Sequence, residues 1–261
     1  MSARILAALV VAWLCSSCSQ LDQGINIPFV PTWNGTSISC DSREPALTDL
    51  RFYVSNVQLI DSEGDARDVR FATEMVWQND AVALIDIENG SNACMNGTAE
   101  TYDHVLGVAP EADYKGLRFT VGVPFRLNHE NPLTAQAPLD DPDMHWHWRS
   151  GYKFLRAGIR TDTDGFWIHT GSAACEGTVG NISDCRFPNR IQVDLPGFVP
   201  GQSIVNIDLA ALVADVALDD GTATDCSSGP PETSCTAPFA ALGLDFTTGE
   251  QSGTQRVFSV Q

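Results

Sequence analysis

The sequence predicts an all-β protein, built as an antiparallel β-sandwich with long loops that disulfides hold in place. Short runs rich in β-branched and aromatic residues recur along the 261 residues, and turn residues, among them 21 Gly and 14 Pro, separate them. Strands that follow one another without alternating long helices favour an antiparallel sandwich over a doubly wound sheet. The 43% hydrophobic content is sufficient for a sizeable core.

Residues 1–18 have the order of a secretory signal peptide, because Arg4 precedes an apolar stretch at 5–14 and small polar residues follow it. The apolar stretch is too short to span a bilayer. Cys18 stands where a bacterial lipoprotein carries its lipid, although Cys15 occupies a position usually held by Leu or Val. Lipidation at Cys18 and simple cleavage are both open.

The charge of the chain excludes several partners. With 15 Lys and Arg against 33 Asp and Glu, the formal net charge is −18, which repels nucleic-acid phosphates and anionic lipids. No segment after the leader is apolar enough for a membrane span. We expect residues 19–261 to form a single exported domain that is either soluble or tethered at its N-terminus, with a lipid as its only membrane attachment.

Six cysteines remain after the leader, and export favours their pairing as disulfides. Two pairs close short loops rich in turn residues, and the third pair follows from them. The expected disulfides are Cys175 with Cys185, Cys226 with Cys235, and Cys40 with Cys94. The alternative is a thiolate metal site, but the mature chain contains no CxxC pair.

Strands are expected wherever short β-rich runs lie between turn residues. Apolar and polar residues alternate over 50–59, and Glu63 and Gly64 then form a turn, which indicates a hairpin. Further strands are expected at residues 81–87, 116–123, 166–170, 190–195, 203–209 and 256–260. The apolar spacing at 207–216 also fits one short helix, and 221–238 is expected to be a turn-rich excursion held by its own disulfide.

The densest group of functional side chains is the segment MHWHWRSGYKF, which begins at Met144. If this segment is extended, period-two alternation places His145 and His147 on one face and Met144, Trp146 and Trp148 on the other. Two such histidines lie about 7 Å apart at Cα, near enough to share a metal ion. The alternative is a solvated edge strand with packed tryptophans.

Two further histidines lie at the ends of expected strands. His129 precedes Pro132 on a constrained loop, and His169 precedes Gly171 close to the expected disulfide of Cys175. Neutral imidazole suits copper, zinc, nickel and iron, so both are candidate ligands. The alternative is a loop histidine that is hydrogen-bonded to backbone carbonyls.

Hydrolytic and nucleotide-dependent chemistry has no support in the sequence. The chain lacks a GxSxG elbow, a GxGxxG loop and a Walker loop. The acidic residues at 140–143 lack the glycine and distal glutamate of an EF-hand. The sequence therefore does not favour these classes of chemistry.

Seven segments follow one another from about residue 49 to residue 246, namely LTDLRFYVSNVQLIDSEG, CMNGT, GLRFTVGVPFRLNHENP, MHWHWRSGYKFLR, IHTGSAAC, CRFPNRIQVDL and CTAPFAALGLDF. Their order resembles the MbnP-like family of exported copper-binding proteins. The resemblance implies a copper-binding, non-catalytic protein of the periplasm, or of the outer membrane or cell surface, and the four-cysteine partner of a metallo-mystery pair. It also implies a partner, a MauG-like di-haem peroxidase-like protein, which oxidises a tryptophan to kynurenine that then binds copper with histidines.

The resemblance assigns roles to residues that match the family's motifs. His129 and His169 match positions that the family keeps as histidine, so they are the first-choice copper ligands. Trp146 and Trp148 match the W-x-W of the family, and one of them, Trp148 in preference, is the candidate for oxidation.

Two features depart from the family's pattern. His145 and His147 fill positions that the family does not reserve for histidine, so they are either additional ligands or variation. The N-terminal histidines of some relatives have no equivalent at residues 21–40.

The oxidation requires a partner, because this chain has no CxxCH haem motif and so no electron sink of its own. The acidic surface is suited to steer a basic partner. The alternative function is a non-catalytic β-sandwich binding module for a glycan, a peptide or a partner protein.

Overall fold

The structure is a computed structural model, and it describes residues 21–73, 75–161, 165–216, 218, 225–228 and 233–261. The predicted signal peptide at 1–18 and the lipidation at Cys18 lie outside the described residues, as does part of the predicted excursion at 221–238.

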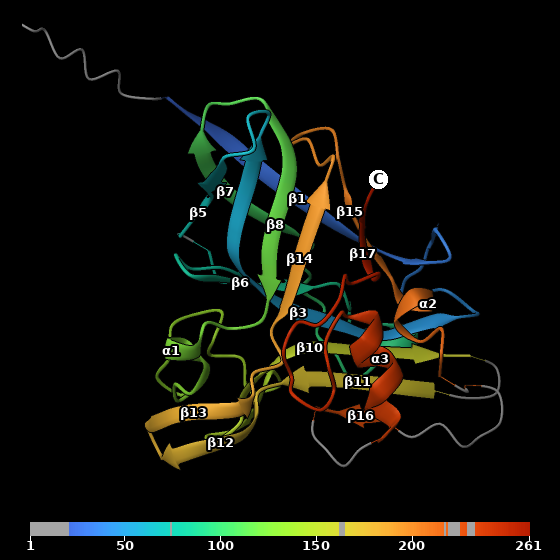
Figure 1. The fold of residues 1–261 in the computed structure, drawn as a ribbon. Coiled ribbons are helices and arrows are strands. Elements are labelled where there is room, and N and C mark those ends of the chain that lie inside the picture. Colours follow the sequence, from blue (N-terminus) through green and yellow to red (C-terminus); the bar gives the residue numbers. More distant parts are fainter. Residues whose placement is uncertain (1–20, 74, 162–164, 217, 219–224, 229–232) are drawn as a thin grey trace, which may run out of the picture.

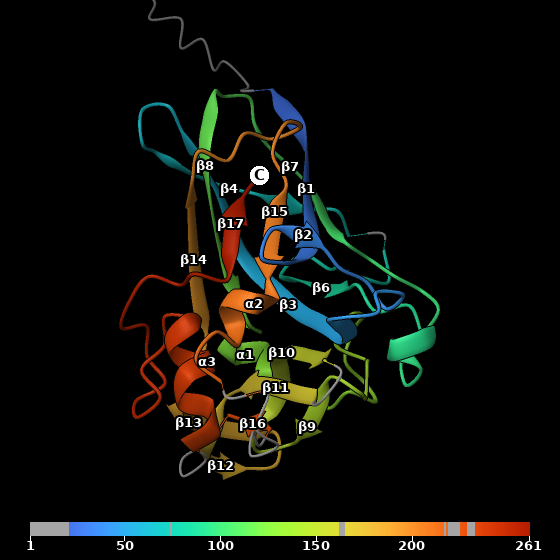
Figure 2. The ribbon, with the colours of Figure 1, turned by 90° about the vertical axis from the view of Figure 1, so that its right-hand side faces the viewer.

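Two sheets face each other across a shared core (Figures 1 and 2). The smaller sheet has the order β17 (Phe258–Val260), β15 (Val205–Asp208), β1 (Asp22–Trp33), β7 (His104–Pro110) and β5 (Arg70–Phe71), with β2 (Thr36–Ser37) on β1. The larger sheet has the order β14 (Ile191–Pro196), β8 (Tyr114–Val121), β3 (Ala46–Asp61), β10 (Gly151–Arg160), β11 (Gly165–Gly171) and β16 (Cys226–Ser227). Its side branches are β4 (Ala66–Asp68) and β6 (Val82–Asp86) on β3, and β9 (His145–His147) on β10.

The predicted all-β class is confirmed, and each predicted strand run contains a strand. The predicted hairpin joins β3 to β4. Most pairs are antiparallel, but β1 pairs with β15, and β11 with β16, in parallel. Parallel neighbours require a long crossover connection, and both pairs join strands far apart in the sequence.

Aromatic rings join the two sheets at the centre of the core. Phe29 of β1 makes edge-to-face contacts with Phe52 of β3, at 5.4 Å between ring centroids, and with Phe119 of β8, at 5.8 Å. All three side chains are buried. The long strand β3 is buried along nearly its whole length, since it lies at the centre of the larger sheet.

Helices are short in the described part of the chain. They are α1 (Phe125–Asn128), α2 (Leu209–Leu212) and α3 (Thr236–Ala241), together with the 3₁₀ turns η1 (Asn92–Cys94) and η2 (Thr233–Cys235). The sequence pattern at 207–216 resolves into the end of β15 followed by α2, and the Asp208 carboxylate caps α2 by accepting from the Ala210 N–H. None of the described helices has the length and apolar character needed to cross a membrane.

All three predicted disulfides are confirmed. They are Cys40–Cys94, Cys175–Cys185 and Cys226–Cys235. The second bond joins β12 (Ala173–Thr178) to β13 (Asn181–Phe187), which form a separate two-stranded sheet. This hairpin lies beside α1 at the lower end of the molecule (Figure 1).

Candidate functional site

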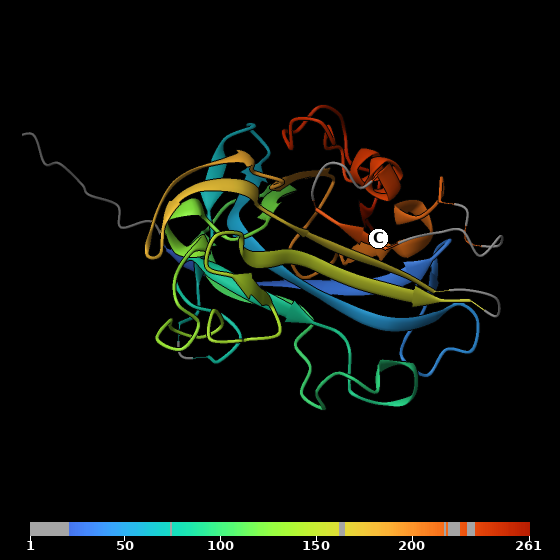
Figure 3. The same cartoon turned by 90° about the horizontal axis from the view of Figure 1, so that it is seen from below.

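The candidate residues gather where β9, β10 and β11 meet, at the end of the molecule that also carries the β12–β13 hairpin (Figure 3). Tyr152 of β10 pairs with His145 of β9, and Arg156 of β10 pairs with His169 of β11. One central strand therefore positions segments that are more than twenty residues apart in the sequence.

His169 of β11 lies near two indole rings, that of Trp146 on β9 and that of Trp167 on β11. Its ring centroid is 6.3 Å from that of Trp146 and 6.3 Å from that of Trp167. Its Nε2 atom is buried and has no hydrogen-bond partner. Burial, and then the positive charges of Arg156 and Lys153, lower the pKa of His169 to about 4. The ring is therefore neutral at neutral pH, which is the form that binds metal ions.

Trp146 reaches His169 because residue 171 is a glycine. A Cβ atom at Gly171 would lie 2.8 Å from the Trp146 ring, closer than real Cβ contacts allow. The missing side chain gives the indole its place over the end of β11.

His145 is directed toward the protein and not toward solvent. Its ring contacts Tyr152 edge to face at 5.1 Å between centroids, and its Nε2 atom is buried without a hydrogen-bond partner. Burial, with His147 and Lys153 nearby, lowers the pKa of His145.

The expected strand at 144–148 is present as the three-residue β9. The alternation predicts that His145 and His147 share one face, but His145 is half-buried and His147 is exposed. Met144 is fully buried in the same cluster as Tyr152, the ring that His145 contacts. The exposed His147 lies against the Trp148 ring, over which Arg149 stacks at 5.0 Å. A register shift between β9 and β10 accompanies this departure from strict alternation.

His129 follows α1 directly and is held by its neighbour Asn128. The Asn128 amide accepts from the Tyr152 N–H through Oδ1 at 3.1 Å and donates through Nδ2 to the Ser150 carbonyl at 3.2 Å. Nδ2 also lies 3.3 Å from His129 Nε2, so this imidazole nitrogen accepts and carries the lone pair. The Nδ1 atom is buried without a hydrogen-bond partner. Burial lowers the pKa of His129, and the hydrogen-bonding effect of the Trp148 backbone raises it in part.

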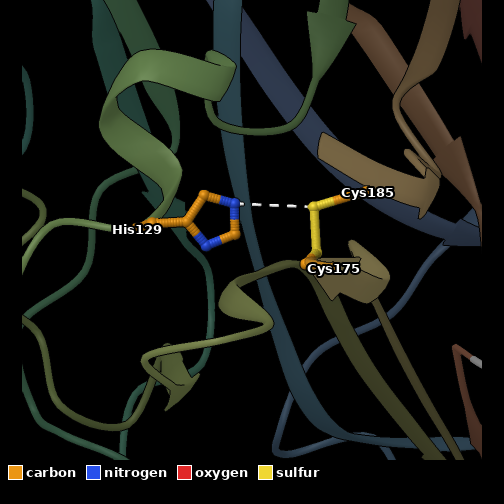
Figure 4. Close-up of side chains that lie close together, drawn as sticks. All are labelled: His129, Cys175 and Cys185. Carbon is orange, nitrogen blue, oxygen red and sulfur yellow. Dashed lines mark hydrogen bonds between the residues drawn. A yellow bond between two sulfur atoms is a disulfide. The ribbon is translucent and has the colours of Figure 1, made fainter. Parts of the chain in front are cut away.

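His129 turns Nε2 to the disulfide of the β12–β13 hairpin, 3.6 Å from Cys185 Sγ (Figure 4). Within the described residues, His129, Cys175 and Cys185 are the one group of three candidate ligand side chains close enough for a single ion, with ligand atoms within 4.8 Å of one another. As a disulfide, the two sulfurs are not thiolates and do not serve as ordinary metal ligands. No ring contact in this part of the structure joins His129 directly to His169.

A buried ion cluster joins β3 to β10, the strand that pairs with β9 and β11. The Asp49 carboxylate of β3 is 2.7 Å from Arg51 Nη2 and 2.7 Å from Arg156 Nε. Asp49 and Arg51 are fully buried. Arg156 thus connects the core cluster to β11, because it also pairs with His169.

Sequence reasoning missed two members of this site, Trp167 and Arg156. Trp167 lies two residues before His169, so the alternation of a strand places both side chains on one face. The sequence FWIHT at residues 166–170 contains this alternation, so it could have identified Trp167. Arg156 has no such signal, because its place beside His169 depends on the pairing of β10 with β11.

The comparisons with known proteins identify the family and agree with the fold. A family model described as MbnP matches residues 22–230. MbnP from Methylosinus trichosporium is similar in structure, with a TM-score of 0.79 and 27% sequence identity over 92% of this chain and 98% of that chain. No curated protein matches. Because the family model covers most of the sequence, the chain belongs to the MbnP family.

Proposed function

We propose that the chain is an exported, non-catalytic copper-binding protein whose site is centred on His169. The observation that carries this proposal is the neutral His169 imidazole, which holds a buried, unpartnered Nε2 near two indoles. Buried polar atoms in proteins are nearly always hydrogen-bonded, so an unpaired imidazole nitrogen at a family site is a candidate ligand atom.

His145 and His129 are the further candidate ligands. Each has a lowered pKa, so each is predominantly neutral at neutral pH. The buried Nε2 of His145 has no hydrogen-bond partner, whereas the lone pair of His129 is on Nε2, which Asn128 contacts. Imidazole nitrogen suits both oxidation states of copper. The ring of His129 carries its lone pair on the side that faces the disulfide, which favours His145 as the second ligand beside His169.

Trp146 is the better candidate for oxidation to kynurenine, in place of the Trp148 that the sequence favours. The Trp146 ring contacts His169, whereas the Trp148 ring contacts His147 and Arg149. An indole has no basic nitrogen, but kynurenine offers an aryl amine and a ketone. In this reaction a four-electron external oxidant, equivalent to one O₂ or two H₂O₂, cleaves the indole C2–C3 bond and leaves one oxygen atom on each carbon. Hydrolysis of the resulting N-formyl group then releases formic acid.

A MauG-like di-haem partner is the proposed source of this oxidising power, acting in the periplasm or at the cell surface. The chain's net charge of −18 suits electrostatic steering of a basic docking face. The partly buried Trp146 is reached at the edge formed by β9.

Copper titration of the purified chain tests the proposal. His169→Ala is expected to weaken copper binding by more than roughly tenfold, because even an outer-shell partner of a metal contributes about that much. His145→Ala is expected to weaken binding also. The matched control is His104→Ala, because His104 lies on β7 in the other sheet and contacts Asp103 and Tyr102. Equal affinities of the His169→Ala and His104→Ala variants would contradict the proposal.

Intact mass tests the modification separately. The chain purified from its native host is expected to be heavier than its mature sequence, calculated without the signal peptide and with the three disulfides formed, by the difference between one oxygen atom and one carbon atom. Trp146→Phe is expected to remove this difference, and Trp148→Phe to retain it. Fragment masses that place the added oxygen on residue 148 would reverse the assignment.

A further inference from the structure

We propose that the disulfide of the β12–β13 hairpin is a redox-controlled metal site. After reduction by a dithiol, Cys175, Cys185 and His129 bind one thiophilic ion, for which Zn²⁺ is the model. This site goes beyond the copper proposal and does not depend on it, because it is built on sulfur and opens only in the reduced chain.

The hairpin places both sulfurs on the same side. Cys175 and Cys185 are directly opposite each other in the antiparallel register of β12 and β13, so their side chains share one face. His129 approaches this face from α1, as Figure 4 shows, with its other ring nitrogen directed away from the sulfurs. Two strands and one helix end thus supply three potential ligands without rearrangement of the backbone.

One ligand distance already fits a tetrahedral ion. Bonds of about 2.3 Å to sulfur and about 2.0 Å to nitrogen place sulfur and nitrogen ligands roughly 3.5 Å apart. The observed distance between His129 Nε2 and Cys185 Sγ is 3.6 Å, and all three ligand atoms lie within 4.8 Å of one another. After reduction, rotation of the cysteine side chains has to separate the two sulfurs and bring Cys175 Sγ to the same distance from Nε2, which leaves a fourth position for water.

The protonation state of His129 is already correct for metal binding. Asn128 donates to Nε2, so the lone pair is on the nitrogen that faces Cys185. The two other hydrogen bonds of Asn128 fix the orientation of its amide, which in turn fixes the tautomer of the imidazole. A metal ion needs only to replace this one long hydrogen bond.

This disulfide is the most accessible of the three. Cys175 is 5% exposed and Cys185 is 7% exposed, whereas the other four paired cysteines are each 2% exposed or less. The hairpin also stands outside the two main sheets. A dithiol therefore reaches this bond more readily than the two bonds in the core.

The chemistry balances with a dithiol as reductant. A thiolate of the dithiol attacks one sulfur, its second thiol completes the exchange, and the dithiol leaves as a disulfide. Cys175 and Cys185 gain two electrons and two protons. When the ion binds, both thiols lose their protons to solvent, and the ion accepts two thiolates and the neutral imidazole.

Cobalt(II) titration of the full mature chain tests the site, because thiolate-to-cobalt charge transfer appears only when sulfur is coordinated. After treatment with dithiothreitol and anaerobic removal of the reductant, the chain is expected to develop this absorption with saturation at one equivalent, and Zn²⁺ is expected to abolish it by displacement. The untreated chain is expected to show none. A reduced chain without charge-transfer absorption would overturn the proposal.

Two variants identify the ligands. Cys175→Ser with Cys185→Ser is expected to lose the absorption, although four other cysteines remain reducible, and His129→Ala is expected to weaken Co²⁺ binding by more than roughly tenfold. If the double variant does not fold, alkylation of the reduced wild-type chain gives the same information, since Zn²⁺ should protect Cys175 and Cys185 alone. Unchanged absorption in a folded double variant, or protection of other cysteines, would refute the assignment.

The copper-binding proposal and the thiolate-site proposal can be refuted independently of each other. Copper binding is measured on the oxidised chain, in which this site is closed, and the charge-transfer signal is measured on the reduced chain with cobalt. His169→Ala is expected to leave the cobalt signal unchanged.

Discussion

Asp49→Ala is expected to lower the free energy of unfolding by about 3–5 kcal/mol, the usual cost of removing one partner from a buried ion pair. The Asp49 carboxylate contacts both Arg51 and Arg156 at 2.7 Å, so its loss removes the nearest anion from two guanidinium groups. Arg51 then keeps the longer contact to Asp143, at 3.8 Å. Burial and the charge of Glu88 raise the pKa of Asp86 to about 8, which makes Asp86 a poorer anion than Asp49.

Urea unfolding measures this effect, and an exposed ion pair provides the control. Asp194 contacts Arg118 at 3.0 Å, with side-chain exposures of 57% and 51%. Asp194→Ala is therefore expected to cost less than about 1 kcal/mol. If the two variants unfold at the same urea concentration, the buried cluster does not contribute as proposed.

Gly151→Ala is expected to be the second most damaging change, at about 2–5 kcal/mol from overpacking combined with a left-handed backbone. Gly151 has a φ of +80°, and a Cβ atom there would lie 2.0 Å from the Asn128 carbonyl oxygen and 2.6 Å from its Nδ2. The new methyl group must displace Asn128, which orients His129. The variant therefore combines lower stability with a misplaced imidazole.

Gly180→Ala separates backbone strain from collision. Gly180 has a similar φ of +73°, but a Cβ atom there would meet nothing within 4 Å, so only the strain of about 1–2 kcal/mol is expected. Thermal unfolding compares the stabilities, and the imidazole signals in NMR spectra report the position of His129. A Gly151→Ala protein with the stability of Gly180→Ala and an unmoved His129 signal would contradict this account.

The sequence was sufficient to predict the strands that carry clear alternation or a short β-rich run. The long strand β1 was missed, because its sequence contains two prolines and shows weaker periodicity. It holds its place through pairing with β7 and β15, which only the folded chain provides. The helix α1 was also missed, since a single turn after Pro124 gives no helical period.

The candidate site could be predicted in composition but not in arrangement. The histidine and tryptophan pattern identified His169 and Trp146, yet their contact depends on a glycine at residue 171 and on the pairing of β10 with β11. The approach of His129 to the hairpin disulfide depends on the position of α1, which no local pattern fixes. Pairings between distant segments are therefore the part that sequence reasoning could not supply.

The short strand β16 covers part of the edge of the larger sheet beside β11. Without it, β11 would end the larger sheet and offer its free backbone groups to the edge of another molecule. β16 pairs with Ile168 and His169, and Ser228 continues the cover by accepting from the Gly171 N–H and donating to the His169 carbonyl. Because Cys226 is bonded to Cys235, this disulfide holds the cover against β11, and reduction of the bond is expected to expose the edge.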